Sequence, residues 1–293
     1  MNVTRRNLLR GASLAPFAAL ELNAFEQDDD GGKPSPFPMP PDDLKLGIAS
    51  YSFREFQRKT MLSMAKKLRV SYINLKDMHM PMVMKDSDRA KAVKSIQDAG
   101  FTILGGGTVD FKKDDDADFE AKFEYAKKSG MPLMVSAPSR TTLPKLEKFV
   151  KKYDIKIAVH NHGPEDKEFP TPQSVLEIVK NLDPRMGCCI DIGHTARTGT
   201  DPVAAVRDAG SRLLDMHVKD LAILQSPDTK IARESQVPVG QGKMPIAAIF
   251  RELKKMNYKG GVMLEYEIHD SDPLPGMFES FSFMRGVLAG LRT

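Results

Sequence analysis

Histidines and carboxylates gather at the ends of four short apolar segments in the C-terminal half of the chain. The residues at these ends that could share one ion are His160, Asp191, His217 and Glu265. Five of the six histidines lie at or just beyond these ends, where chance placement would scatter them. Imidazole and carboxylate together are ligands of transition-metal ions. The pattern therefore predicts one bound divalent metal ion, with Mn, Zn, Co, Fe and Mg as the candidates.

Other polar side chains at the same ends could carry out chemistry beside such an ion. Residues two apart on a strand share one face, so Lys219 accompanies His217, and Glu267 accompanies Glu265. The candidates for proton transfer are Glu265, Glu267, His194 and Lys219. The candidates for substrate binding are Lys76, His79, His162 and Arg197.

Eight short segments rich in Val, Ile, Leu or Met are expected to form parallel strands. They are Lys45–Tyr51, Tyr72–Lys76, Thr102–Gly105, Pro132–Ala137, Lys156–Asn161, Met186–Asp191, Leu213–Lys219 and Gly261–Tyr266. Helical patterns lie between them, with start signals at Thr171-Pro172, Asp201-Pro202 and Pro245 and one clear span over Asp88–Ala99. Eight strands alternating with helices predict an α/β fold, a single-domain (β/α)₈ TIM barrel over residues 44–293. In such barrels the active site lies at the carboxyl ends of the strands.

The alternative architecture is an open, doubly wound sheet. That fold would favour a G-x-G-x-x-G turn after the first strand, and none is present. The triple glycine Gly105–Gly107 is expected to follow the third strand. One connection, Leu221–Lys243, shows no clear element, and we expect it to be a lid over the site.

The N-terminal region is expected to lie outside the barrel. Residues 1–25 combine Arg5 and Arg6 with a short apolar run, which is typical of a twin-arginine export signal. Residues 26–43 are rich in Pro, Gly and Asp, which indicates a disordered linker. We therefore expect a periplasmic or otherwise exported protein whose mature form has no membrane span.

Composition limits the classes of partner. The net charge of +4 is small and no basic stripe is interleaved with aromatic residues, so nucleic acid is not an expected partner. Cys188 and Cys189 are adjacent, so on a strand they point to opposite faces and are expected to be packing residues. Composition leaves open whether the chain forms a homo-oligomer.

The strand ends resemble those of the xylose isomerase-like TIM barrel superfamily, the sugar phosphate isomerase/epimerase group. The resemblance covers the chain from Leu44 onward. Its motifs are G-I-A-S-Y-S-F-R at 47–54, H-N-H-G at 160–163, D-I-G-H at 191–194, H-V-K-D at 217–220 and L-E-Y-E at 264–267.

The resemblance implies a metal site and a sugar or polyol substrate. In the epimerases of this group two glutamates, an aspartate and a histidine hold one ion, and the glutamates also move protons on opposite faces of the sugar. Asp191, His217 and Glu265 match this pattern, whereas His160 stands where the first glutamate is expected. This departure disfavours a symmetric two-glutamate epimerisation.

Four functions are weighed against these observations. The first is a carbohydrate isomerase or epimerase that acts through a metal-stabilised enediolate. The second is a lyase or dehydratase on a keto-sugar or 3-keto-glycoside with the same metal site. The third is a non-catalytic sugar-binding protein. The fourth, a DNA-repair endonuclease, would need a trinuclear zinc site with more ligands than are evident here.

Overall fold

The computed structural model describes residues 42–292 of the chain. The expected export signal, and the expected linker as far as Pro41, lie outside the described residues. Asp42 and Asp43, the end of that linker, are tied to the last two helices. Asp42 Oδ2 lies 3.6 Å from Arg285 Nε, and Asp43 Oδ2 lies 3.0 Å from Lys254 Nζ.

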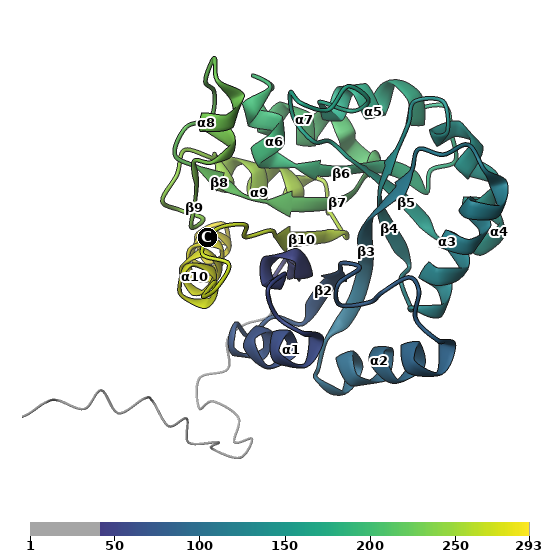
Figure 1. Cartoon of the computed structure of the whole chain (residues 1–293). Helices are drawn as coiled ribbons and strands as arrows, with labels where there is room; N and C mark the ends of the chain where they lie inside the picture. Colours follow the sequence, from purple (N-terminus) through teal and green to yellow (C-terminus); the bar gives the residue numbers. More distant parts are fainter. Residues whose placement is uncertain (1–41, 293) are drawn as a thin grey trace, which may run out of the picture. The chain divides into compact units, whose positions relative to one another are not determined.

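Eight parallel strands close into a barrel in the order β1-β10-β7-β6-β5-β4-β3-β2 (Figure 1). Their bounds are β1 Lys45–Ala49, β2 Tyr72–Leu75, β3 Thr102–Phe111, β4 Leu133–Pro138, β5 Lys156–His160, β6 Met186–Asp191, β7 Leu213–Val218 and β10 Gly261–Leu264. The predicted barrel is confirmed, and each predicted strand overlaps an observed one. Most boundaries differ by a residue or two, as is usual where strand ends fray.

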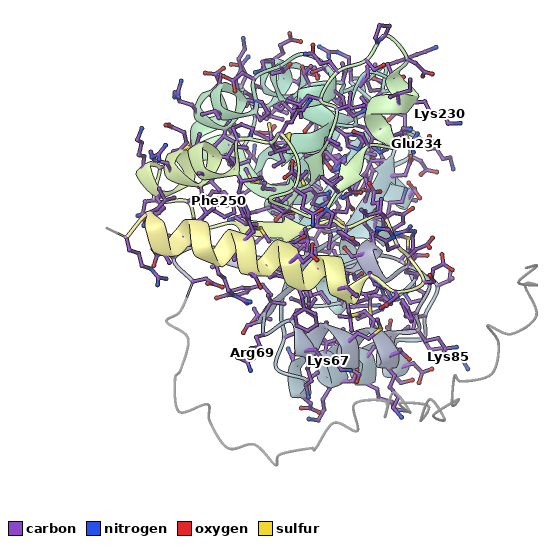
Figure 2. All side chains as sticks on the ribbon, turned by 90° about the vertical axis from the view of Figure 1, so that its left-hand side faces the viewer. Lys67, Arg69, Lys85, Lys230, Glu234 and Phe250 are labelled. Carbon is purple, nitrogen blue, oxygen red and sulfur yellow. The ribbon has the colours of Figure 1, made fainter. Side chains whose placement is uncertain are left out.

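Helices surround the strands. The longer ones are α1 Arg58–Lys67, α2 Asp86–Asp98, α3 Asp116–Lys128, α4 Glu147–Tyr153, α5 Pro172–Val179, α7 Pro202–Ala209, α9 Ile246–Lys255 and α10 Leu274–Gly290. Short helical turns lie at α6 Ile192–Arg197, α8 Thr229–Arg233, Ser50–Phe53, Leu143–Leu146 and Gly210–Arg212. Figure 2 shows α10 lying along the outside of the barrel, next to Phe250 of α9. None of the described helices is both long enough and apolar enough to cross a bilayer.

Sequence signals account for the starts of several helices. The Thr171 hydroxyl accepts a hydrogen bond from Ser174 N at 3.2 Å, and Pro172 occupies the first helical position of α5. Asp201 caps α7 in the same way through Val203 N at 2.8 Å. Asp115 caps α3 by accepting hydrogen bonds from Ala117 N and Asp118 N, so the run of three aspartates at 114–116 is a helix start.

The third strand is longer than the sequence suggested, because the triple glycine lies inside β3 and does not follow it. A Cβ on Gly105 would lie 2.9 Å from the Leu133 carbonyl oxygen, and one on Gly107 would lie 2.1 Å from that of Val135. Gly107 also has φ of 123°, a conformation that side chains disfavour. These glycines therefore allow the close approach of β3 to β4.

The segment predicted to lack a clear element contains three short ones. Asp220–Leu221 (β8) pairs with Gln236–Val237 (β9) in an antiparallel sheet, and α8 lies between them. The Asp220 carboxylate accepts hydrogen bonds from the backbone of Gly240 at 2.8 Å, Gly242 at 3.0 Å and Met244 at 3.0 Å. The expectation of an irregular loop was wrong because these bonds link residues that are about twenty positions apart. Its role as a lid stays a prediction.

The register of neighbouring strands brings the ends of β5, β6, β7 and β10 together. Cys189 pairs with His160, Asp191 with His217, and Met263 with His217. Since alternate side chains of a strand share a face, Asp191, His217 and Glu265 all point into the barrel. Cys188 and Cys189 are buried free thiols in separate apolar clusters, as expected for opposite faces.

Candidate metal centre

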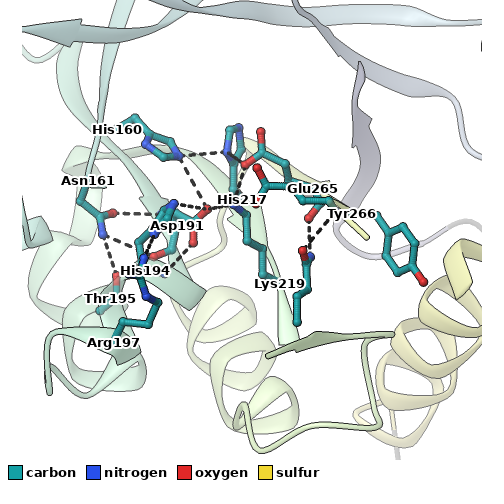
Figure 3. A network of polar contacts seen from close by, with 12 residues as sticks. His160, Asn161, Asp191, His194, Thr195, Arg197, His217, Lys219, Glu265 and Tyr266 are labelled. Carbon is teal, nitrogen blue, oxygen red and sulfur yellow. Dashed lines mark hydrogen bonds and ion pairs between the residues drawn. The ribbon is translucent and has the colours of Figure 1, made fainter. Parts of the chain in front are cut away.

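Four side chains converge at the carboxyl end of the barrel. His160 ends β5, Asp191 ends β6, His217 lies on β7, and Glu265 directly follows β10. One candidate ligand atom from each lies within 4.8 Å of all the others, and all four residues are buried. These are the four side chains that the sequence predicted to share an ion, and they meet in space (Figure 3).

The candidate ligand atoms of the cluster lie close to one another. His160 Nε2 lies 3.2 Å from His217 Nδ1 and 3.7 Å from Asp191 Oδ2. His217 Nδ1 lies 3.0 Å from Glu265 Oε2. Asp191 Oδ2 is buried and accepts no hydrogen bond, although the Lys219 ammonium is 3.1 Å away. Buried acceptors are normally satisfied, so this geometry and the donor set fit a divalent cation.

Burial and charge set the protonation of the cluster. Burial lowers the pKa of His160 to about 4, so the neutral ring offers a lone pair. Burial alone would raise the pKa of Asp191, but the Lys219 ammonium holds it well below its usual range. Burial would likewise raise the pKa of Glu265, yet His217 and Lys219 lower it strongly. Both carboxylates are therefore ionised, as metal ligands must be.

A second group of potential ligands lies deeper in the barrel and suits a metal less well. It comprises Cys189, Asp215 and His217. Burial raises the pKa of the Cys189 thiol well above its usual value and that of Asp215 to about 7. Asn74 Nδ2 also donates to Asp215 Oδ2 at 2.7 Å. A protonated thiol is a poor ligand, so this group is better explained as a packed polar layer beneath the metal centre.

Two lysines flank the Glu265 carboxylate. Lys76 Nζ lies 3.2 Å from Glu265 Oε1, while Lys219 Nζ lies 3.0 Å from Glu265 Oε2. Lys219 also contacts Glu267 Oε2 at 2.5 Å. The structure thus brings three predicted residues, Lys76, Lys219 and Glu267, to the metal centre. Glu267 is the most exposed of the three, at 36% of its side-chain surface, and lies at the rim.

His194 and Arg197 form a pair beside the cluster. Arg197 Nη1 lies 2.9 Å from His194 Nδ1. A guanidinium can only donate, so Nδ1 accepts and the ring hydrogen of neutral His194 lies on Nε2. That nitrogen lies 4.0 Å from Asp191 Oδ2. Burial also lowers the pKa of His194 well below its usual value. His194 is thus arranged as a hydrogen-bond donor toward the centre and poorly suited to be a base.

The predicted substrate-binding residues do not all reach the centre. Arg197 is buried, and its Nη2 donates to the Glu165 carboxylate and to Thr229 O, so the structure gives it a positioning role. His162 is exposed, and its ring lies 5.2 Å from that of His160. His79 lies elsewhere. It is fully buried, with Nδ1 2.9 Å from Ser50 Oγ and Nε2 2.9 Å from Phe56 O, so neither ring nitrogen is available to a substrate.

Two supporting residues were not predicted. Asn161 Oδ1 accepts from Asp191 N at 3.0 Å, and Asn161 Nδ2 donates to Thr195 Oγ1 at 3.1 Å, which fixes the strand that carries Asp191. Gln236 Nε2 donates to Glu265 O at 2.8 Å, and Glu267 N donates to Gln236 Oε1 at 3.1 Å. A polar residue next to His160 was a signal for Asn161. The sequence carried no such signal for Gln236, because its segment showed no clear helix or strand pattern.

The fold agrees with the comparison against known families. The sequence profile of the xylose isomerase-like TIM barrel family matches residues 62–287. Because this match spans most of the chain, the protein belongs to that family.

Curated relatives match over shorter stretches. The inosose dehydratase of Clostridium tetani is 24% identical over 138 residues, which cover 43% of this chain and 45% of that protein. The rhizopine catabolism protein MocC of Rhizobium meliloti is 26% identical over 128 residues, covering 40% of this chain and 38% of that protein. The chain spans about half the length, or less, of the curated relatives it matches.

Solved structures share the fold over most of the chain. The IolI protein, solved with a zinc atom, gives a TM-score of 0.70 at 19% identity and covers 84% of this chain and 99% of its own. A D-psicose 3-epimerase, solved with D-fructose, gives 0.62 at 20% identity and covers 85% of this chain and 98% of its own. At these identities the likeness is one of fold. The relatives in this superfamily thus include both epimerases and dehydratases.

Proposed function

We propose that this chain is a metal-dependent carbohydrate isomerase or epimerase that removes a proton from a carbon next to a carbonyl group. The observation that carries the proposal is the convergence of two imidazoles and two carboxylates within 4.8 Å at the mouth of the barrel. A divalent ion held by these four side chains would polarise a carbonyl oxygen and stabilise the negative charge that develops when the proton leaves.

Glu267 is the residue that we assign as the base. Glu265 belongs to the ligand set, and both of its oxygens face cationic or imidazole partners. Glu267 is instead linked to the candidate ligands Asp191 and Glu265 through Lys219, which contacts all three carboxylates, and its side chain lies at the exposed rim. Burial alone would lower the pKa of Lys219, but the Asp191 and Glu265 carboxylates raise it well above the usual range. Lys219 therefore remains an ammonium. Lys219 can thus hold an oxyanion and orient Glu267.

The opposite wall has fewer groups that can exchange a proton. His160 belongs to the ligand set, and Nδ1 of His194 is occupied by Arg197. His162 is the remaining imidazole on that wall that is open to a substrate. An epimerase needs proton transfer on both faces of the sugar, whereas an isomerase can work from one face. The arrangement therefore supports isomerisation driven by Glu267 and Lys219, with His162 as the partner for epimerisation.

A lyase or dehydratase on a keto-sugar or 3-keto-glycoside is the second proposal. The same one-sided arrangement favours it, because a base and a neighbouring ammonium on one wall suit removal of a proton followed by loss of a leaving group. The sequence similarity to an inosose dehydratase also supports this reaction class.

Deuterium exchange tests the proposal. The protein is loaded with Mn²⁺, Co²⁺ or Zn²⁺ in D₂O and offered ketoses, inososes and 3-keto-glycosides. Deuterium in a retained sugar supports isomerisation, and release of water or an aglycone supports elimination. Glu267→Gln should abolish exchange while leaving the bound metal in place, whereas Glu234→Gln, an exposed carboxylate on the adjoining segment, should have no effect. Sugar binding with neither exchange nor release would contradict both proposals and indicate a non-catalytic binding protein.

A further inference from the structure

A cavity of about 630 Å³ adjoins the metal centre. Its walls come from the segments that follow β3, β4, β5 and β6 and from α8. His162, His194 and Arg197 line the side toward the metal centre. Because His194 also lies beside Asp191, a substrate whose reacting carbons sit at the metal centre would extend into this cavity.

The acidic residues that line the cavity are already bonded within the chain. Glu165 pairs with the Arg197 guanidinium. Asp166 Oδ1 accepts hydrogen bonds from the backbone of Glu168 at 2.8 Å and of Phe169 at 3.2 Å. Glu168 Oε2 in turn accepts from Arg140 N at 2.8 Å. These carboxylates are thus engaged with donors of the chain itself.

The basic residues of the cavity are not engaged in this way. Within the described part of the chain, neither Lys167 nor Arg233 makes an ion pair or side-chain hydrogen bond, and both are exposed. Lys112 has one carboxylate within ion-pair distance, that of Asp110, at 3.9 Å. Three cationic groups from three separate segments thus line the cavity, and none of them forms an ion pair with a carboxylate that lines it.

We infer that the cavity binds an anionic substituent of the substrate, so that the enzyme acts on an acidic sugar or an anionic glycoside. This inference rests on the proposed function, because it requires the reacting end of the substrate to lie at the metal centre. Lysine and arginine bind carboxylate, sulfate ester and phosphate groups alike. Charges on exposed side chains contribute modestly one by one, so recognition would come from the three acting together.

Binding of simple sugars to the metal-free full chain tests the inference. D-glucose is compared by calorimetry or ligand-observed NMR with D-glucuronate, glucose 6-sulfate and glucose 6-phosphate, in EDTA. We expect the native chain to bind at least one anionic sugar roughly tenfold more tightly than glucose, with a preference that falls as salt is added. The anion that binds most tightly identifies the substituent.

Two triple variants separate this cavity from general surface charge. Lys112→Gln, Lys167→Gln and Arg233→Gln together should remove the preference for anions. The matched control is Lys67→Gln, Arg69→Gln and Lys85→Gln, which removes three charges that project from another part of the surface (Figure 2). It should leave the preference unchanged.

Three results would overturn the inference: equal binding of glucose and all three anions, no binding of any sugar, or an anion preference that survives in the cavity variant. Failure of the proposed function looks different. In that case the preference for anions would persist in EDTA, while metal-loaded protein would show no exchange with any sugar.

Discussion

Replacing Lys219 by methionine should make the protein depend on metal for its stability. The Lys219 ammonium lies 3.1 Å from Asp191 Oδ2, 3.0 Å from Glu265 Oε2 and 2.5 Å from Glu267 Oε2. The lysine and the first two carboxylates are almost completely buried, with side-chain exposures of 5%, 0% and 4%. In the metal-free protein, Lys219 is therefore a principal counter-charge for two buried anions that are also candidate metal ligands.

The expected size of the effect follows from this burial. Leaving a buried charge without its partner costs about 3–5 kcal/mol. In a domain of about 250 residues, each kcal/mol shifts the melting temperature by about 2–4 °C. Metal-free Lys219→Met should thus melt roughly 6–20 °C below the native chain. A divalent ion held by the same carboxylates restores the missing positive charge, so added metal should stabilise the variant more than the native protein.

Scanning calorimetry in EDTA, and then with excess Mn²⁺, measures both effects. Lys76→Met is the graded comparison, because it removes a cation from Glu265 alone and at a partly exposed position, so a smaller loss is expected. Lys230→Met, at a solvent-exposed position, should match the native chain. The reasoning about this charge cluster is refuted if Lys219→Met and the native chain have the same melting temperature in EDTA, or if Mn²⁺ raises both melting temperatures equally.

Three further predictions concern neighbouring residues. Asn161→Ala should weaken metal binding by about 10–100-fold without removing a ligand, because Asn161 fixes the backbone of Asp191; calorimetric metal titration measures this, and unchanged affinity would contradict it. Arg197→Met should release the His194 ring from a single tautomer, which ¹⁵N NMR of the imidazole reports as a mixture; one unchanged tautomer would show that Arg197 does not control it. Burial raises the pKa of Cys188 to about 12, so a thiol reagent at pH 8 should label it in urea and not in the native protein, and rapid native labelling would contradict its burial.

The parts of the site that the sequence could predict are those set by strand periodicity. His217 and Glu265 could be expected in one cluster because residues two apart share a face and parallel strands end at one edge of the barrel. The same rule placed Lys219 and Glu267 beside them. The barrel itself was predictable because short apolar strands alternate with helices that carry clear start signals, such as Thr171-Pro172.

The parts that could not be predicted depend on contacts between residues far apart in the chain. Arg197 was expected to bind substrate, but Glu165, thirty-two positions earlier, pairs with its guanidinium. His79 was expected near the substrate, but Ser50 and Phe56 take both of its ring nitrogens. The local sequence pattern carries no information about such distant partners. A polar residue that lines the candidate site therefore cannot be told from one that lies nearby and is bonded to another part of the chain.

The central claim is that His160, Asp191, His217 and Glu265 bind one ion. The most direct test is the metal content of purified protein after equilibration with Mn²⁺ or Zn²⁺ and dialysis, measured by mass spectrometry. We predict one ion per native chain, close to none in His160→Ala, Asp191→Asn or His217→Ala, and one in His269→Ala, which removes an exposed histidine outside the set. A native chain that retains no ion, or ligand variants that retain as much as the native chain, would contradict the account.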